Sequence, residues 1–212
     1  MKNIVIFGDS YSTFSGYIPK GYAPYYPSLD VQTVEDTWWK KFVAKTGVNL
    51  VLNNSWSGST ICYTGWEKVD CSKTSSFIYR YRQLKEENFF TEDKVDTVFV
   101  FGGTNDSWSD SPLGQMMLSD WTEKDLYNAL PAICYLMAVM KADLPNLNIV
   151  FIVNAGLKSE IVSCMKQASE YYGVKTIFLQ DAEKMEGHPT AKGMTEICEN
   201  IIIELKGLLA SC

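Results

Sequence analysis

The fold is decided near the amino terminus by the stretch Ile4-Val5-Ile6-Phe7-Gly8-Asp9-Ser10. Its first four residues are apolar and three of them are β-branched, which predicts a short buried strand. Gly8-Asp9-Ser10 is a cluster of turn-forming residues that ends this strand. Open α/β sheets bind their ligands at the carboxyl ends of the strands, so Ser10 is expected at a ligand-binding rim. By itself, however, the triplet is also ordinary turn chemistry.

Farther along the chain, short apolar segments alternate with amphipathic ones. The segments predicted as strands are 3–8, 48–52, 97–101, 147–153 and 175–179, and those predicted as helices are 33–45, 76–88, 123–141, 159–172 and 190–209. Such alternation favours right-handed crossovers and a mainly parallel sheet with helices on both faces. We therefore predict one three-layer α/β domain over residues 1–212, with a five-stranded sheet of the Rossmann or flavodoxin-like type.

The composition argues against some classes of binding partner. The formal net charge of −6 argues against nucleic acid or an anionic membrane surface. No run of 18 or more apolar residues is present, so a transmembrane segment is not expected. The first residues lack the pattern of a signal peptide. The sequence as written thus predicts a cytoplasmic protein, or a secreted or periplasmic one if a leader has been removed. It does not indicate the oligomeric state.

The six cysteines do not form the pattern of a disulfide scaffold or a zinc site. Cys134, Cys164 and Cys198 lie in predicted helices and are expected as buried free thiols. Cys62 and Cys71 flank a loop and would be able to pair in an oxidising compartment. With one histidine and no CxxC motif, a Cys/His zinc site is not predicted.

Four residues that suit acyl transfer follow four of the predicted strands. Ser10 comes after the first strand, Gly58 after the second, Asn105 after the third and His188 after the fifth. The carboxyl ends of parallel strands share one edge of a sheet, so these groups are expected to meet there. A serine hydroxyl needs a base to become a good nucleophile, and an imidazole suits that task. Backbone amides and the Asn105 amide would stabilise a tetrahedral oxyanion.

These residues lie in four sequence blocks: Gly8-Asp9-Ser10-Tyr11, Gly58 in a serine- and asparagine-rich loop, Gly103-Thr104-Asn105-Asp106, and Gly187-His188-Pro189. The blocks, in this order, resemble the SGNH hydrolases of the GDSL esterase/lipase superfamily. The resemblance spans nearly the whole chain and implies a flavodoxin-like fold without metal or cofactor. It also implies Ser10 as nucleophile, His188 as base, and an oxyanion hole formed by Ser10, Gly58 and Asn105.

The sequence departs from the family pattern at one position. The family usually has an aspartate three residues before its histidine, and Met185 stands there. A third group is expected because it orients the histidine and stabilises its charged form. Glu186 is the first choice as the catalytic acid, Asp181 and Glu183 are alternatives, and a backbone carbonyl would serve in a serine–histidine dyad.

The loops at the predicted rim are rich in aromatic residues, namely Tyr11, Phe14, Tyr17, Tyr22, Tyr25, Tyr26, Trp56, Tyr63, Trp66 and Trp108. Aromatic side chains that line a cleft suit an organic acyl group or a sugar ring. We therefore expect a serine esterase for a small carboxylic ester, with a short acyl group such as acetyl, on a small molecule or a carbohydrate. The main alternative is a non-catalytic carbohydrate- or ligand-binding module on a decayed esterase fold. A flavin- or phosphate-binding protein gives no role to Asn105 or His188.

Overall fold

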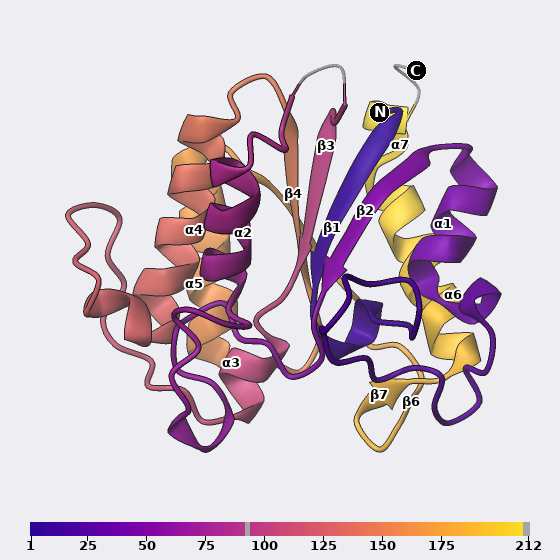
Figure 1. The fold of residues 1–212 in the computed structure, drawn as a ribbon, viewed down its shortest axis with the longest axis horizontal. Helices are drawn as coiled ribbons and strands as arrows, with labels where there is room; N and C mark the ends of the chain where they lie inside the picture. Colours follow the sequence, from indigo (N-terminus) through magenta and orange to yellow (C-terminus); the bar gives the residue numbers. More distant parts are fainter. Residues whose placement is uncertain (92–93, 210–212) are drawn as a thin grey trace.

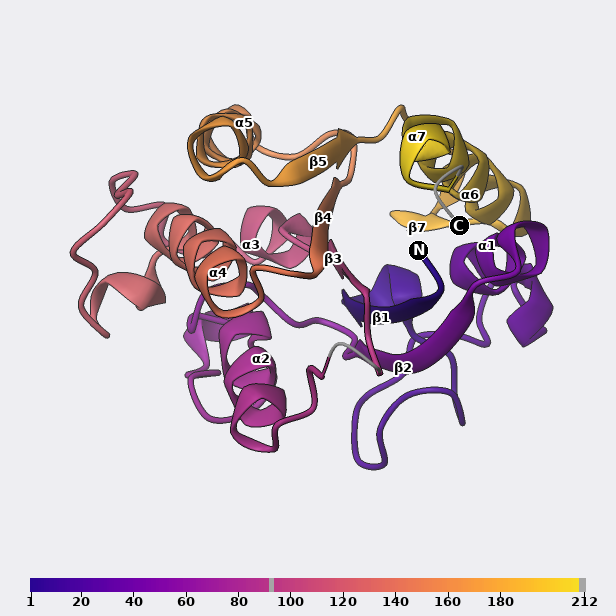
Figure 2. The same cartoon turned by 90° about the horizontal axis from the view of Figure 1, so that it is seen from above.

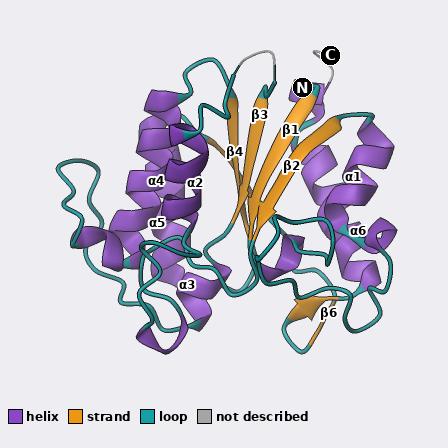
Figure 3. Cartoon of the chain, viewed as in Figure 1, coloured by secondary structure: helices purple, strands orange, loops and turns teal. Residues whose placement is uncertain are grey.

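The computed structural model describes residues 1–91 and 94–209 and contains a five-stranded parallel sheet (Figures 1 and 3). In chain order the strands are β1 (Asn3–Gly8), β2 (Asn49–Ser55), β3 (Thr97–Phe101), β4 (Asn148–Val153) and β5 (Lys175–Phe178). Their spatial order is β2-β1-β3-β4-β5, which is the flavodoxin-like order. The predicted three-layer α/β fold with a parallel sheet is confirmed.

Helices cover both faces of this sheet (Figure 2). One face carries α1 (Trp38–Thr46), α6 (Ala191–Glu204) and the short α7 (Lys206–Leu209), and the other carries α2 (Phe77–Glu86), α4 (Ala129–Asp143) and α5 (Ser159–Tyr172). Among the described residues, no helix is both long and apolar enough to span a membrane.

The first strand shows why its sequence is an uninterrupted apolar run. Val5 and Phe7 belong to the hydrophobic core on the side of α2, α4 and α5, whereas Ile4 and Ile6 belong to the core on the side of α1 and α6. All four side chains are buried, because alternate residues of a central strand point to opposite faces and both faces are covered. The strand needs no polar face, since helices cover it on both sides.

The predicted helix 33–45 begins later than expected. Thr33 caps only a 3-10 turn at Val34–Asp36, where it forms a capping box with Asp36. Thr37 is then extended and caps α1 by accepting a hydrogen bond from the backbone of Lys40. Two successive caps therefore divide a segment whose composition is typical of one helix.

The predicted helix 123–141 also begins later, at Ala129. The carboxylate of Asp125 accepts hydrogen bonds from the backbone N–H and the hydroxyl of Thr122, both at 2.7 Å, and this closes a 3-10 turn at Asp125–Tyr127. Asn128 is extended and separates the turn from α4. Spacing of apolar residues continues through this turn, so it did not reveal the boundary.

The five cysteines among the described residues are buried and free. This confirms the expectation for Cys134, Cys164 and Cys198, and it shows that Cys62 and Cys71 are not paired in this structure. Cys212 lies outside the described residues.

Candidate active site

Three short elements gather at the carboxyl edge of the sheet, the lower end of the molecule in Figure 1. They are the 3-10 turn Ser10–Ser12, helix α3 (Thr104–Trp108), and the hairpin of β6 (Lys184–Met185) and β7 (His188–Pro189). Each follows the end of a strand, and each carries one of the residues singled out from the sequence. The sequence did not predict the hairpin or α3 as regular elements.

The hydroxyl of Ser10 meets the imidazole of His188 at this edge. The distance between Ser10 Oγ and His188 Nε2 is 3.0 Å, and His188 Nδ1 lies 3.3 Å from the main-chain oxygen of Glu186. A carbonyl oxygen only accepts hydrogen bonds, so Nδ1 carries the ring proton and Nε2 is left to accept the Ser10 hydroxyl. Burial lowers the pKa of His188, which favours the neutral base.

The β6–β7 hairpin explains what replaces the family's aspartate. Glu186 and Gly187 form its tip with φ values of 51° and 79°, the left-handed pair of a type I′ turn. This turn pairs Met185 directly with His188 across the hairpin. It also brings the carbonyl of Glu186, rather than its carboxylate, to Nδ1 of His188. Among the described residues the Glu186 carboxylate makes no hydrogen bond to His188, but its charge raises the pKa of His188 against the larger effect of burial, and its role as catalytic acid stays a prediction.

The other two candidate acids bind elsewhere. Asp181 forms an ion pair with Lys184, with an N–O distance of 3.0 Å. The carboxylate of Glu183 accepts hydrogen bonds from the Thr190 hydroxyl at 2.7 Å and from Lys192 at 3.0 Å. Within the described residues, the hydrogen-bonded arrangement is therefore a serine–histidine dyad oriented by a backbone carbonyl, one of the possibilities left open by the sequence.

Three tyrosines hold His188 and its hairpin in place. The hydroxyl of Tyr11 donates to the carbonyl of Gly187 at 2.6 Å, and that of Tyr26 donates to the carbonyl of Pro189 at 2.7 Å. The ring of Tyr25 stacks on the imidazole with a centroid distance of 3.6 Å and an interplanar angle of 9°. Sequence reasoning placed these residues at the rim but missed these roles. The position of Tyr11 directly after Ser10 was the one available signal.

Hydrogen bonds that involve Ser59 hold the predicted oxyanion residues Gly58 and Asn105 near the end of β1. The backbone N–H of Trp56 and the hydroxyl of Ser59 donate to the carbonyl of Gly8, at 3.1 and 3.4 Å. Between them Gly58 adopts a left-handed φ of 78°, which a residue with a side chain rarely adopts. Asn105 is buried and donates from Nδ2 to the carbonyl of Ser59 at 3.0 Å.

A buried arginine braces the same region from inside the molecule. Arg80 of α2 donates to the carbonyl of Gly8 at 3.2 Å, to the hydroxyl of Ser59 at 3.0 Å, and to both oxygens of Asn54 at the end of β2. Burial lowers its pKa to about 10, so the guanidinium is still charged at neutral pH. One cation therefore links the ends of β1 and β2 to the loop that contains Gly58.

Two buried aspartates support the backbone around the dyad. Asp106 accepts hydrogen bonds from the backbone N–H groups of Ile61 and Cys62, at 2.8 and 3.0 Å, and so ties that loop to α3. Asp9 accepts from the backbone N–H of Tyr11 at 3.1 Å. Burial raises the pKa of Asp9 to about 7. Its contacts support the turn around Ser10.

The ten rim aromatics differ in exposure, and Tyr22, Tyr25 and Trp56 are half-buried. Four are buried, namely Tyr11, Phe14, Tyr26 and Tyr63, and three are exposed, namely Tyr17, Trp66 and Trp108. Trp108 lies edge-on to His188 with a centroid distance of 6.0 Å, and Trp66 donates its indole N–H to Asn105. Each of these two exposed tryptophans is thus next to one of the predicted site residues.

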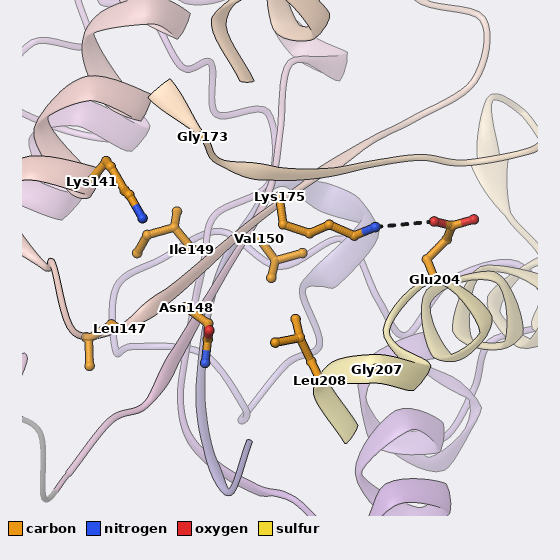
Figure 4. Close-up of a pocket in the computed structure, with 10 residues that line it drawn as sticks. All are labelled: Lys141, Leu147, Asn148, Ile149, Val150, Gly173, Lys175, Glu204, Gly207 and Leu208. Carbon is orange, nitrogen blue, oxygen red and sulfur yellow. Dashed lines mark hydrogen bonds and ion pairs between the residues drawn. The ribbon is translucent and has the colours of Figure 1, made fainter. Parts of the chain in front are cut away.

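A separate pocket of about 410 Å³ lies at the other end of the strands (Figure 4). It is lined by residues at the start of β4 and β5 and by α7, and Lys175 forms an ion pair with Glu204 at 3.5 Å on its wall. It contains none of the five predicted site residues. The chemistry described above belongs to the opposite edge of the sheet.

The chain is similar to several solved structures. Two proteins that are described as GDSL-like lipases match almost end to end. The one from Bacteroides uniformis is 39% identical with a TM-score of 0.89, over 97% of this chain and 96% of that one. The one from Bacteroides ovatus is 40% identical with a TM-score of 0.86, over 98% and 99%.

A more distant structure shares the fold. It is the acetyl xylan esterase Est2A from Butyrivibrio proteoclasticus, which is 15% identical with a TM-score of 0.62, over 99% of this chain and 64% of that one. No protein of curated function matches the chain. The family model for GDSL-like lipase/acylhydrolase, in contrast, matches residues 2–205. The chain therefore belongs to the GDSL-like lipase/acylhydrolase family and is a hydrolase.

Proposed function

We propose that the protein is a serine esterase that hydrolyses a small carboxylic ester through an acyl-enzyme. The observation that carries this proposal is the 3.0 Å contact between Ser10 Oγ and His188 Nε2, with Nδ1 held by a backbone carbonyl. This arrangement gives a hydroxyl nucleophile and a neutral base in the correct tautomer.

In the first half of the reaction, Ser10 Oγ attacks the ester carbonyl carbon while His188 Nε2 takes the hydroxyl proton. The resulting oxyanion is stabilised by the backbone N–H groups of Ser10 and Gly58 and by Nδ2 of Asn105. The imidazolium then gives its proton to the departing alcohol, which leaves an acyl group on Ser10. Water, deprotonated by His188, attacks the acyl-enzyme, and the acid is released as Ser10 recovers its proton.

The absence of a hydrogen-bonded carboxylate changes the energetics of the base. The Glu186 carbonyl holds the imidazole tautomer as a carboxylate would, but it carries no full charge to stabilise the imidazolium. The stacked ring of Tyr25 presents its π face to the same imidazole, and such a face attracts a cation. The Glu186 carbonyl thus takes over the orienting role of the usual acid, while the charge of the nearby Glu186 carboxylate and the ring of Tyr25 favour the imidazolium.

The exposed aromatics support a short acyl group on a sugar-like alcohol. Both Trp108, which lies beside His188, and Trp66, which is hydrogen-bonded to Asn105, have exposed rings, and such apolar faces suit sugar rings. The names of distant structural neighbours agree with this, since they include an acetyl xylan esterase and carbohydrate esterases of family two. We propose acetyl or a similarly short group as the preferred acyl part.

A second function has one specific observation in its favour. No carboxylate is hydrogen-bonded to His188 among the described residues, as would be expected of a decayed esterase that only binds carbohydrate. In that case the folded protein would bind a sugar ester without turning it over.

The test compares hydrolysis of p-nitrophenyl acetate, butyrate and octanoate by the wild type, Ser10→Ala and His188→Ala. We expect turnover of acetyl ester that both substitutions abolish, and a decline in kcat/KM with acyl length. Full activity of folded Ser10→Ala would disprove the nucleophile assignment. A preference for octanoate would disprove the short acyl group.

A further inference from the structure

Trp66 combines an exposed ring with an inward-pointing polar atom. It begins the short 3-10 turn Trp66–Lys68, and 46% of its surface is exposed. Its indole Nε1 nevertheless donates a hydrogen bond to Oδ1 of Asn105 at 3.0 Å, and Asn105 is only 3% exposed. The indole thus covers one of the proposed oxyanion donors from the solvent side and binds its oxygen.

The hydrogen bonds of Asn105 fix the orientation of its amide. An indole N–H only donates and a backbone carbonyl only accepts, so Oδ1 must face Trp66 and Nδ2 must face Ser59. Nδ2 has two N–H groups, and the carbonyl of Ser59 uses one of them. The other is left for the oxyanion. A rotated amide would bring Oδ1 toward the oxyanion, where two negative oxygens would repel.

The same indole also lies near the second donor segment. A Cβ atom added at Gly58 would lie 3.7 Å from Cδ1 and 3.8 Å from Nε1 of Trp66, which is ordinary van der Waals contact. Trp66 therefore packs beside the left-handed turn at Gly58 while it binds the amide of Asn105. One of the three proposed oxyanion donors is therefore hydrogen-bonded to Trp66, and a second lies beside the same side chain.

The loop that carries Trp66 is tightly constrained. Gly65 donates from its backbone N–H to the carbonyl of Val69 at 2.8 Å, and Glu67 and Lys68 take left-handed φ values of 54° and 62°. A Cβ at Gly65 would come within 2.5 Å of Cys71 Sγ. Left-handed residues with side chains are costly and persist where the surroundings impose them, often at functional sites. Here they hold one exposed tryptophan over the oxyanion residues.

We propose that Trp66 is a positioning residue of the oxyanion hole, which acts on the reaction through the amide of Asn105. This inference rests on the proposed esterase function. It assigns to Trp66 a role that is separate from those of Ser10 and His188. Oδ1 of Asn105 accepts a hydrogen bond from the fixed indole N–H instead of from mobile water. This hydrogen bond keeps the remaining N–H of Nδ2 in position before the transition state forms.

The kinetic test is a double-mutant cycle between Trp66→Phe and Asn105→Ala on p-nitrophenyl acetate. Phenylalanine keeps an aromatic ring beside Gly58 but removes the donor. We expect Trp66→Phe to lower kcat by about tenfold with little change in KM, since removal of a whole donor costs about 10²–10³ in kcat. In the Asn105→Ala background the same change should alter kcat by less than about twofold.

Trp121→Phe is the matched control. Like Trp66, Trp121 donates its indole N–H, in this case to the backbone carbonyl of Met117 at 2.8 Å, but it packs on Tyr135 of α4 and not on the site. This variant should keep wild-type kcat and KM. A purely structural effect of losing one indole hydrogen bond would lower activity in both tryptophan variants through their stability.

A spectroscopic measurement tests the contact without turnover. In protein labelled with ¹⁵N at the tryptophan indoles, Trp66→Phe identifies the Trp66 Nε1–H resonance by its loss. Asn105→Ala should shift this resonance upfield and speed its exchange with water, whereas Ser10→Ala should leave it in place.

Three results would overturn the inference. Equal kcat losses from Trp66→Phe in both backgrounds, or a change in KM alone, would make Trp66 only a substrate contact. A Trp66 resonance that ignores Asn105→Ala would remove the contact itself. An inactive wild type that no serine-reactive probe labels would instead refute the proposed function, and the role of Trp66 would fall with it.

Discussion

At the scale of single residues, the proposed chemistry requires His188 to be neutral when Ser10 attacks. Burial disfavours the imidazolium and lowers the pKa of His188 below its ordinary value of about 6.5. We therefore expect kcat/KM to rise with pH through an apparent pKa below about 6.5 and to level off near neutrality. Burial raises the pKa of Asp9 to about 7, so Asp9→Asn is the control. An acid limb centred above 6.5 in both proteins would contradict this assignment.

Tyr25 is the residue whose ring lies flat on that imidazole. The stack uses the aromatic ring and not the hydroxyl, so phenylalanine would stack in the same way. Tyr25→Phe should therefore keep kcat within about twofold. Tyr25→Ala should lower kcat by about tenfold, because aromatic pairs contribute about 0.5–1.5 kcal/mol beyond their buried area. Steady-state kinetics on p-nitrophenyl acetate distinguish the two variants. Equal losses in both would show that the hydroxyl, rather than the ring, is what matters.

At the scale of elements, the β6–β7 hairpin decides how the dyad is oriented. Met185 pairs with His188 across the hairpin, so a side chain at residue 185 is a direct neighbour of the imidazole. Met185→Asp should raise the pKa of His188 and move the acid limb of kcat/KM upward by up to about 1 pH unit, because a nearby anion favours the imidazolium. Met185→Asn is the uncharged control and should leave the limb unmoved. A limb that stays in place with aspartate would mean that the two side chains do not face each other.

At the scale of the whole molecule, Asp9 links folding to pH. Its pKa is about 7 in the folded protein, against an ordinary value of 3.8. Between these values the folded state binds more protons than the unfolded state, so the free energy of unfolding falls as pH rises. This contribution is fully present below about pH 4 and is lost as the pH passes 7.

Urea unfolding at pH 5 and pH 8 measures this linkage. The wild type should lose about 2–3 kcal/mol from Asp9 over this interval, at 1.36 kcal/mol for each unit of pKa difference. Asp9→Asn keeps an oxygen for the N–H of Tyr11 and should lack this loss. The difference between the two proteins isolates Asp9 from His188, whose lowered pKa acts in the opposite direction. An identical pH dependence in both proteins would mean that Asp9 is ionised throughout.

The sequence predicted the fold well where burial dictates composition. Segment 97–101 is apolar at nearly every position because helices cover both faces of β3, and the structure has the strand at Thr97–Phe101. Helix starts were less accurate. Side-chain caps at Thr37 and the turn closed by Asp125 interrupt segments whose apolar spacing continues unchanged. Hydrophobic periodicity reports which face is buried, and it does not report where a backbone turn intervenes.

Ser10 and His188 were predicted because each follows a strand and belongs to a recognisable block, and the structure brings them together. Their supporting contacts were not predictable, because they join residues that are distant in the chain. Tyr11 and Gly187 are 176 positions apart, and Tyr26 and Pro189 are 163 apart. The Glu186 carbonyl was missed as the first choice because a backbone acceptor has no sequence signature. Only the hairpin geometry reveals it.

Covalent labelling by a fluorophosphonate tests whether Ser10 is an activated nucleophile, because the probe reacts with an activated serine whatever the natural substrate is. Peptide mapping of the labelled wild type should place the adduct on Ser10. Ser10→Ala should not be labelled, and His188→Ala should be labelled far more slowly. A folded wild type that fails to react, or undiminished labelling of Ser10→Ala, would contradict the account of a Ser10–His188 esterase.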